Sequence, residues 1–465
     1  MHEPDLCIRG HRVVTEHGIG PASLHITHGY VSSISIFEDV PSSALEVIEA
    51  NPESIVMPGL VDTHVHVNEP GRTDWEGFEN ATRAAAAGGV TTIVDMPLNS
   101  IPATTTLDGL KAKLAAAEGK LHVDAAFWGG VVPGNTSELA KLWDAGVVGF
   151  KCFLIHSGVD EFPNVTENDL REAMPVLARL GAPLIVHAEV PGPVEATGVS
   201  QFRVGTCSHA DGGQVRHLNK YETFLQSRPR EAENEAVALM IRLARETGCR
   251  IHIVHHSSAD ALPLLRNAKR FGLPLTVETC PHYLHFAAED IPDGATEFKC
   301  CPPIREGENR EELWEALRDG TIDFVVSDHS PCPPDMKLRE QGDFMKAWGG
   351  ISSLQLRLPI MWTEARARGF TIEDLTKWLC REPARQVGLN LKGVIKDGHD
   401  ADIVIWNPDK EFVVEPSVIE HRHKLTPYNG ETLRGVVEKT FVRGQMVYDD
   451  GAFSRSGGRL LLRST

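Results

Sequence analysis

The chain repeats one pattern, a short β-branched run that ends in polar residues and is followed by a helical stretch rich in Ala, Leu and Glu. The pattern predicts strands at 55–66, 91–97, 124–130, 147–154, 183–189, 250–257, 275–284 and 323–329. Predicted helices fill the intervals, at 76–88, 107–119, 136–145, 167–180, 231–248, 259–271 and 309–320. Alternating strands and helices with short links are typical of α/β proteins with a parallel sheet. Eight such units predict a closed (β/α)8 TIM-type barrel.

The two ends of the chain follow a different pattern. Residues 1–54 and 385–465 contain short strand-like runs separated by turn residues, with little helix. We therefore expect both ends to build one small β-rich domain, and residues 55–384 to form the barrel. Two segments, about 190–230 and about 330–350, are longer than a barrel needs and follow strands at the face where barrel sites lie. They are candidate lids, with packing at a subunit interface as the alternative.

Composition narrows the class of protein. The 64 Asp and Glu residues outnumber the 46 Lys and Arg residues, and the resulting charge of −18 argues against nucleic acid or an anionic membrane as a partner. No apolar run reaches the roughly 18 residues of a membrane span, and the first residues lack the apolar core of a secretory signal. The nine cysteines are scattered without a CxxC pair, so we expect reduced thiols and a cytoplasmic protein.

The sharpest chemical signal is the pair His64 and His66. Residues two apart on a strand project to the same face, so both imidazoles are expected to point inward at the C-terminal end of the first barrel strand. Two neutral imidazoles on one face make half of a metal site. Because the chain contains 21 histidines, a chance His-x-His is not rare, and two ordinary buried histidines are the alternative.

Further titratable residues recur at the corresponding ends of other predicted strands. They are Lys151, His187, His255, His256 and Asp328. The loops that follow barrel strands build the site at this rim, so these residues are predicted to share one site. His255 and His256 lie on opposite faces of their strand, and the pattern does not decide between them. His252 and His282 are expected to be core residues or to lie behind the site.

Lys151 lies inside an apolar run, where an ammonium group is costly to bury and cannot bind a metal. One interpretation is a buried ion pair with Asp328 or Glu189. The other is carbamylation by CO2, which turns the amine into an anionic bridge between two metals. With two divalent cations, the carbamate, the Asp328 carboxylate and a bridging hydroxide leave one net positive charge, which suits a site that stabilises an oxyanion.

Segments along nearly the whole chain resemble the allantoinases of the cyclic amidohydrolase family, whose other members include dihydropyrimidinases, hydantoinases and dihydroorotases. The segments are MPGLVDTHVHVNEPGRTDWEGFENATRAAAAGGVTT, MPLNSIPAT, GVVGFKCF, VHAE, VHHSS, ETCPHYL, KCCPPIRE, VVSDHSPCPP, KAWGGI and GHDADIVIW. The resemblance implies two divalent metal ions whose ligands are His64, His66, carbamylated Lys151, His187, His255 and Asp328. It favours His255 over His256 because the family's ligand stands two residues before the Ser257-Ser258 pair. Zinc suits these ligands, and cobalt, manganese or iron would also bind.

The resemblance also implies a reaction, the hydrolysis of the hydantoin ring of allantoin to allantoate by a metal-bridging hydroxide, a step of purine catabolism. Asp328 would carry the proton from the attacking water to the leaving nitrogen. Cys301, Ser330 and Asn99 are expected near this cyclic ureide substrate. A homotetramer is implied as well.

Two departures from sibling enzymes guide the choice of substrate. Asn68 stands where dihydroorotases carry Arg, and no Tyr follows Lys151 as it does in hydantoinases and dihydropyrimidinases. Both departures favour allantoin. The alternatives are another cyclic amide, such as a hydantoin or a dihydropyrimidine, and a non-catalytic scaffold, which the filled ligand positions disfavour.

Overall fold

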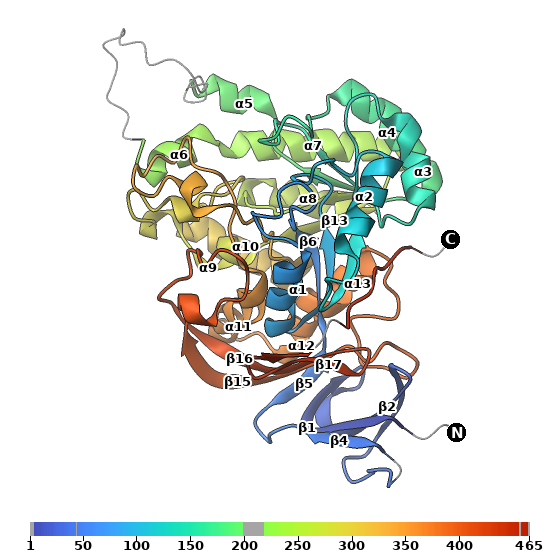
Figure 1. Ribbon diagram of the computed structural model, residues 1–465. Helices are drawn as coiled ribbons and strands as arrows, with labels where there is room; N and C mark the ends of the chain where they lie inside the picture. Colours follow the sequence, from blue (N-terminus) through green and yellow to red (C-terminus); the bar gives the residue numbers. More distant parts are fainter. Residues whose placement is uncertain (1–3, 43, 199–217, 455–456, 464–465) are drawn as a thin grey trace.

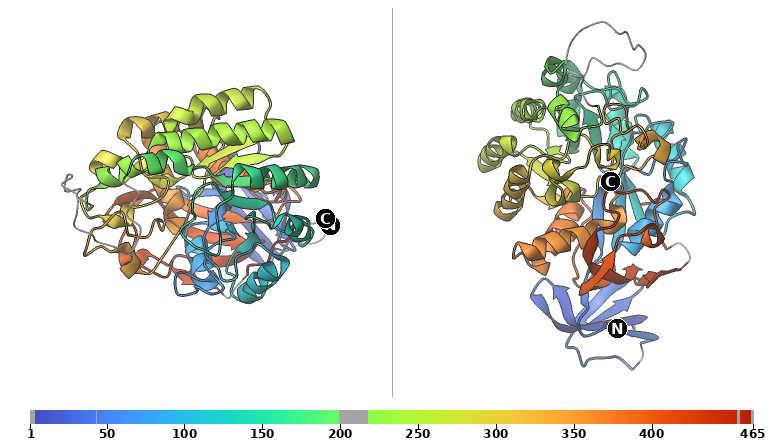
Figure 2. Two further views of the ribbon diagram at one scale, coloured as in Figure 1. Left: turned by 90° about the horizontal axis from the view of Figure 1, so that it is seen from above. Right: turned by 90° about the vertical axis from the view of Figure 1, so that its left-hand side faces the viewer.

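The computed structural model describes residues 4–42, 44–198, 218–454 and 457–463. Helices and parallel strands form the larger part of the molecule, and a mixed sheet built from both ends of the chain lies against it (Figure 1). The right-hand view of Figure 2 shows the N-terminal strands, in blue, at the far end of this sheet from the helical part. Within the described residues, every helix is too short or too polar to cross a membrane.

The barrel strands follow the predicted order. They are β6 (Leu60–Val65), β7 (Val90–Asp95), β8 (Asp124–Phe127) with β9 (Gly129–Gly130), β10 (Phe150–Phe153), β11 (Leu184–His187), β12 (Ile251–Ile253), β13 (Leu275–Thr279) and β14 (Phe324–Val325). One sheet contains β6 to β8 and another contains β9 to β14. Because β8 and β9 are two parts of one segment separated by Trp128, the sheets share this strand. A parallel bridge between Val65 and His329 joins the other edges.

Helices connect the strands and cover the outside of the barrel (Figure 1). The longer ones are α1 (Phe78–Ala87), α2 (Leu107–Ala117), α4 (Glu167–Leu180), α7 (Arg230–Thr247), α8 (Leu262–Arg270), α10 (Gly307–Asp319) and α11 (Arg357–Ala367). Shorter ones are α3 (Leu139–Asp144), α5 (Pro191–Ala196), α6 (Tyr221–Ser227), α9 (Pro281–His285), α12 (Ile372–Thr376) and α13 (Glu382–Gln386). Local sequence sets their ends: Thr166 and Asp169 form a capping box at the start of α4, and Gly181 ends that helix with a left-handed φ of 68°.

Both ends of the chain contribute to the mixed sheet, as expected from their composition. Its strands are β1 (Leu6–Thr15), β2 (Gly18–Thr27), β3 (Tyr30–Ser35), β4 (Glu46–Glu49), β5 (Ile55–Pro58), β15 (Ile403–Val413), β16 (Thr432–Val442), β17 (Gln445–Asp449) and β18 (Ala452–Phe453).

Most barrel strands are shorter than predicted, and two predicted strands also include residues of a different element. The strand predicted at 55–66 is divided, because β5 pairs with β1 and β15 in the mixed sheet whereas β6 belongs to the barrel. The chain passes between them at Gly59, where an added Cβ would lie 2.2 Å from the Thr91 side chain, so only glycine fits. The strand predicted at 275–284 ends at Thr279, because Pro281 begins α9.

A buried ionic cluster links the mixed sheet to the barrel. Lys392 Nζ lies 2.9 Å from Asp124 of β8, 2.9 Å from Asp400 and 2.6 Å from Asp402. Arg443 also pairs with Asp124. The pKa of Lys392 is raised because the three carboxylates outweigh the effect of burial. This acidic group therefore already has its counter-charges, and we interpret it as a structural link rather than a metal site.

Candidate metal and active site

The six residues expected to bind metal meet at the C-terminal ends of the barrel strands. They come from β6 and the residue after it, from β10, from the end of β11, and from the segments that follow β12 and β14. All six line one cavity of about 490 Å³: His64, His66, Lys151, His187, His255 and Asp328. Each is at most 7% exposed, so the cavity floor is a buried cluster of donor groups.

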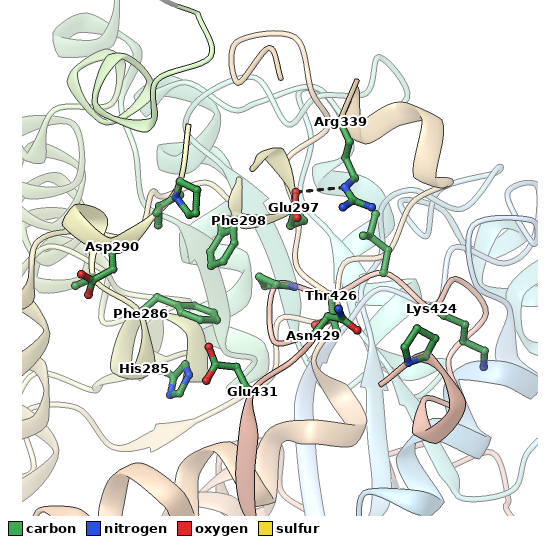
Figure 3. Close-up of a pocket in the computed structure, with 16 residues that line it drawn as sticks. His285, Phe286, Asp290, Glu297, Phe298, Arg339, Lys424, Thr426, Asn429 and Glu431 are labelled. Carbon is green, nitrogen blue, oxygen red and sulfur yellow. Dashed lines mark ion pairs between the residues drawn. The ribbon is translucent and has the colours of Figure 1, made fainter. Parts of the chain in front are cut away.

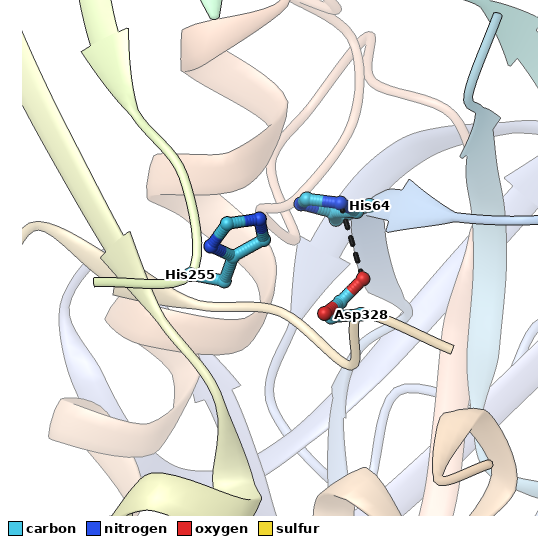
Figure 4. Close-up of side chains that lie close together, drawn as sticks. All are labelled: His64, His255 and Asp328. Atoms are coloured by element: carbon cyan, nitrogen blue, oxygen red, sulfur yellow. Dashed lines mark ion pairs between the residues drawn. The ribbon is translucent and has the colours of Figure 1, made fainter. Parts of the chain in front are cut away.

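Their donor atoms point toward one another. His64 Nε2 and His66 Nε2 lie 3.2 and 3.5 Å from Asp328 Oδ1, and His187 Nδ1 lies 3.0 Å from His255 Nε2. His64, His255 and Asp328 each offer an atom within 4.8 Å of the others. Figure 4 shows these three side chains lying close together. Separations of this size allow several of these side chains to bind a common cation.

Several of these atoms lack the hydrogen bonds that buried polar groups normally make. Lys151 Nζ, His64 Nε2 and His255 Nδ1 are buried with no hydrogen-bond partner among the described residues. Such exceptions in a folded protein require an explanation, and a bound ion is one. The donor set of imidazoles, a carboxylate and an amine open to carbamylation therefore fits a pair of divalent cations.

The structure bears on two alternatives that the sequence left open. Lys151 has no ion-pair partner among the described residues, and Glu189 instead pairs with His187 (2.8 Å) and Arg228 (3.0 Å), so the predicted buried ion pair of Lys151 is wrong. His255 lines the cavity, whereas His256 is not among its lining residues. The geometry thus favours His255.

Burial sets the protonation of the site. It lowers the pKa of Lys151 to about 8, although the carboxylates of Asp328 and Glu278 oppose the shift. It also lowers the pKa of His64 and His255, and neighbouring positive charges add to the effect. Neutral imidazoles are the form that binds metal, and only the neutral amine reacts with CO2.

Two carboxylates that do not line the cavity, Glu278 and Glu189, bond ring nitrogens of the cavity histidines His64 and His187. Glu278 accepts from His64 Nδ1 at 2.5 Å and from His252 Nε2 at 2.9 Å, and Glu189 bonds His187 Nε2 at 2.8 Å. Such partners fix the ring orientation and tautomer of a metal-binding histidine. Sequence reasoning missed the role of Glu278, although a carboxylate inside the apolar run LTVET was an available signal.

The backbone at the site is strained in two places. His255 and Asp328 have φ angles of 36° and 45°, in the left-handed region that few side chains adopt. His255 lies two positions after the end of β12, and Asp328 lies three positions after the end of β14. Strain of this kind persists where surrounding packing fixes a functional side chain.

A model of the amidohydrolase family matches residues 55–447. The chain belongs to the amidohydrolase family. It is 49% identical to an allantoinase of Streptomyces avermitilis, with all of both chains covered. It is 43% identical to an allantoinase of Arabidopsis thaliana (98% of this chain, 91% of the relative) and 46% identical to one of Saccharomyces cerevisiae (92% and 90%).

Solved structures agree with this assignment. An L-hydantoinase (dihydropyrimidinase) from Arthrobacter aurescens matches with a TM-score of 0.90 at 33% identity, covering 99% of this chain and all of the other. A D-hydantoinase (dihydropyrimidinase) from Thermus sp. matches with a TM-score of 0.86 at 26% identity, covering 98% and 99%. The predictions of a TIM-type barrel with a small β-rich part and of a cyclic amide hydrolase are confirmed.

The cavity walls of this amidohydrolase include the three residues expected near the substrate, Asn99, Cys301 and Ser330. Asn99 Nδ2 lies 3.3 Å from His66 Nδ1, whereas its Oδ1 has no partner among the described residues. The oxygen is therefore available as an acceptor.

One wall belongs to the predicted lid at 330–350. Lys299 Nζ donates to the carbonyls of Met345 and Ala347 at 3.1 and 2.6 Å, and Lys337 Nζ donates to two further carbonyls of the segment 345–350. These two buried ammonium groups hold the segment against the cavity. Of the other predicted lid, 190–230, residues 199–217 lie outside the described residues.

A second cavity of about 560 Å³ lies between α9 and the segment that leads into β16 (Figure 3). Some of its titratable groups pair with neighbours: Glu297 lies 3.6 Å from Arg339, and His285 bonds Glu364 at 2.7 Å. The donor atoms do not converge on one point as they do in the catalytic cavity, so the chemistry belongs to the smaller cavity.

Proposed function

We propose that this amidohydrolase opens the hydantoin ring of allantoin by hydrolysis and releases allantoate. The observation that carries the proposal is the convergence of His64, His66, Lys151, His187, His255 and Asp328 on one cavity. Full-length relatives at 43–49% identity support allantoin as the substrate. The solved hydantoinases are more distant, at 26–33% identity.

We propose that these six side chains hold two divalent metal ions, with Lys151 carbamylated by CO2 and zinc as the metal. A bound pair of such ions supplies hydroxide near neutral pH and polarises the substrate carbonyl. The lowered pKa of Lys151 supports carbamylation, because it raises the fraction of reactive neutral amine.

Asp328 is the proposed proton carrier. Its carboxylate accepts the proton of the attacking water as the new carbon–oxygen bond forms. It then donates that proton to the ring nitrogen as the carbon–nitrogen bond breaks. The products are a neutral ureide nitrogen and a carboxylic acid, which carries the second proton of the water and releases it to solvent as the carboxylate forms. The position of Asp328, between His64 and His66 and on the cavity surface, supports both transfers.

Two positions, Asn99 and Asn68, support recognition of a neutral ureide rather than an acid. Asn99 Oδ1 is free to accept from a substrate N–H, and Ser330 and Cys301 lie on the same cavity. Asn68, at the position where dihydroorotases carry Arg, is buried and donates to the backbone oxygen of Pro331 at 3.3 Å. No cation therefore stands at this position to hold a substrate carboxylate.

Kinetics of the zinc-loaded enzyme with allantoin, hydantoin, dihydrouracil and dihydroorotate test the proposal. We expect allantoin to have the highest kcat/KM, and the double substitution His64→Ala and His66→Ala to abolish turnover and bound metal. His17→Ala, which removes an exposed histidine outside the catalytic cavity, is the control. Higher kcat/KM with another substrate would reject allantoin, and unchanged turnover in the double variant would reject the chemistry.

We further propose a homotetramer, as the resemblance to the family implies, and a cytoplasmic location, as the scattered cysteines without a CxxC pair suggest. Light scattering coupled to gel filtration measures the oligomer, and fractionation of the source cells measures the location. A monomer in solution or the protein in a membrane fraction would contradict these two proposals.

A further inference from the structure

A second group of metal-binding side chains shares Asp328 with the catalytic cluster. Cys280 and His282 stand on either side of Pro281, directly after β13. One donor atom from each of Cys280, His282 and Asp328 lies within 4.8 Å of the other two. Cys280 and His282 are completely buried and are not among the residues that line the catalytic cavity. They therefore form a group distinct from the six residues described above, joined to them through one carboxylate.

His282 is the unusual member of this group. Both of its ring nitrogens are buried without a hydrogen-bond partner among the described residues. A buried imidazole that serves only for packing normally satisfies at least one of them. The ring packs edge to face on Tyr283 with centroids 4.2 Å apart, which limits its rotation. The sequence predicted that His282 is a core residue or lies behind the site. The structure shows that it is buried, with two ring nitrogens that make no hydrogen bond among the described residues, close to a thiol and a carboxylate.

We propose that Cys280, His282 and Asp328 form an additional site for one thiophilic divalent cation, such as Cd²⁺ or surplus Zn²⁺, and that its occupancy inhibits hydrolysis. A thiolate, an imidazole and a carboxylate are the donors that such cations prefer. On binding, the Cys280 S–H bond breaks, its proton leaves to solvent and a sulfur–metal bond forms. The thiolate and carboxylate charges then balance the dication.

Inhibition follows from the shared carboxylate. A cation that binds Asp328 on the side facing Cys280 occupies the carboxylate oxygen atoms. These oxygen atoms are then no longer available for the proton transfer of the proposed reaction. Of the three residues, only Asp328 lines the catalytic cavity, so its carboxylate is where a cation in that cavity meets the group. The inhibitory effect rests on the proposed function, whereas cation binding itself does not.

The test uses the zinc-loaded enzyme titrated with CdCl2. Thiolate-to-cadmium absorption in the ultraviolet, bound zinc and cadmium by elemental analysis, and allantoin hydrolysis are measured together. We expect one cadmium to bind while the catalytic zinc is retained, with the thiolate band appearing and activity falling in parallel. Cys280→Ala should keep its basal activity, lose the band and need at least about tenfold more cadmium for the same inhibition.

Three variants make the result decisive. Cys249→Ala removes a buried thiol after α7, away from the cavity lining, and should behave as the unmodified enzyme. His282→Gln should weaken cadmium binding even if Cys280→Ala fails to fold. If the band and the inhibition persist in Cys280→Ala, or disappear only in Cys301→Ala, the proposed site is wrong. If cadmium binds as expected but allantoin is never hydrolysed, the site stands and the proposed function fails.

Discussion

Replacing Lys151 with methionine should stabilise the metal-free protein and weaken the metal-loaded one. The amine is fully buried and has no hydrogen-bond partner among the described residues, although it lies 5.0 Å from the centroid of the Phe153 ring. Burial lowers its pKa from 10.5 to about 8. At about 1.36 kcal/mol per pKa unit, the charged form reduces the free energy of unfolding by about 3 kcal/mol. Methionine fills a similar volume without a charge, so little packing is lost.

The sign of the pH dependence follows from the lowered pKa. Because the folded pKa lies below the unfolded one, the destabilisation is fully present below pH 8 and disappears as the pH rises from about 8 to 10.5. Metal reverses the order of stability, because a ligand that binds only the folded state of the unmodified protein stabilises it by mass action.

Urea unfolding of chelated, CO2-free protein at about pH 6.5 and about pH 9.5 measures this effect. We expect Lys151→Met to be the more stable protein at the lower pH, with a smaller difference at the higher pH. The same pair with zinc and bicarbonate should show the opposite order. Lys113→Met is the matched control, because Lys113 is equally buried but pairs with Asp95 at 2.6 Å, and its loss should destabilise the protein in every condition.

Two results would refute this reasoning. Equal unfolding midpoints for the two metal-free proteins at both pH values would show that the Lys151 amine is already compensated. Equal stabilisation of both proteins by zinc and bicarbonate would show that Lys151 takes no part in holding metal.

Three further predictions concern the surrounding carboxylates. Asp328→Asn should lower kcat by about 100- to 10,000-fold in steady-state kinetics, with KM little changed, because the proton carrier is lost. Glu278→Gln should lower metal affinity about 10- to 100-fold in a chelator competition, because His64 Nδ1 loses its carboxylate partner. Burial raises the pKa of Glu189, but Arg228, His187 and Arg305 together outweigh this effect and hold the pKa at about 2, with Arg228 the largest of the three. Glu189 therefore stabilises the fold above about pH 4.5 and loses this effect as the pH falls toward 2. Arg228→Gln should lower the free energy of unfolding at neutral pH, and its difference from the unmodified protein should become smaller in acid. Unfolding followed by circular dichroism measures both.

The sequence by itself determined the architecture and most of the candidate site. The alternation of β-branched runs and amphipathic helices predicted the barrel, because these periodicities report which side of each element is buried. The same logic placed His64 and His66 on one face of the first strand, and Lys151, His187 and Asp328 at the rim of others. These properties depend on residues that are close together in the sequence, so they can be predicted without the tertiary structure.

Only the tertiary structure decided how distant residues meet. Glu278 and His64 stand 214 residues apart, and no local pattern joins them. The break at Gly59 was not predicted because β5 and β6 are both fully buried and only one residue separates them, whereas their different sheet partners are set by the tertiary structure. The missing partner of Lys151 and the open nitrogens of His282 likewise depend on strand order and barrel curvature, which set distances between side chains that periodicity alone does not specify.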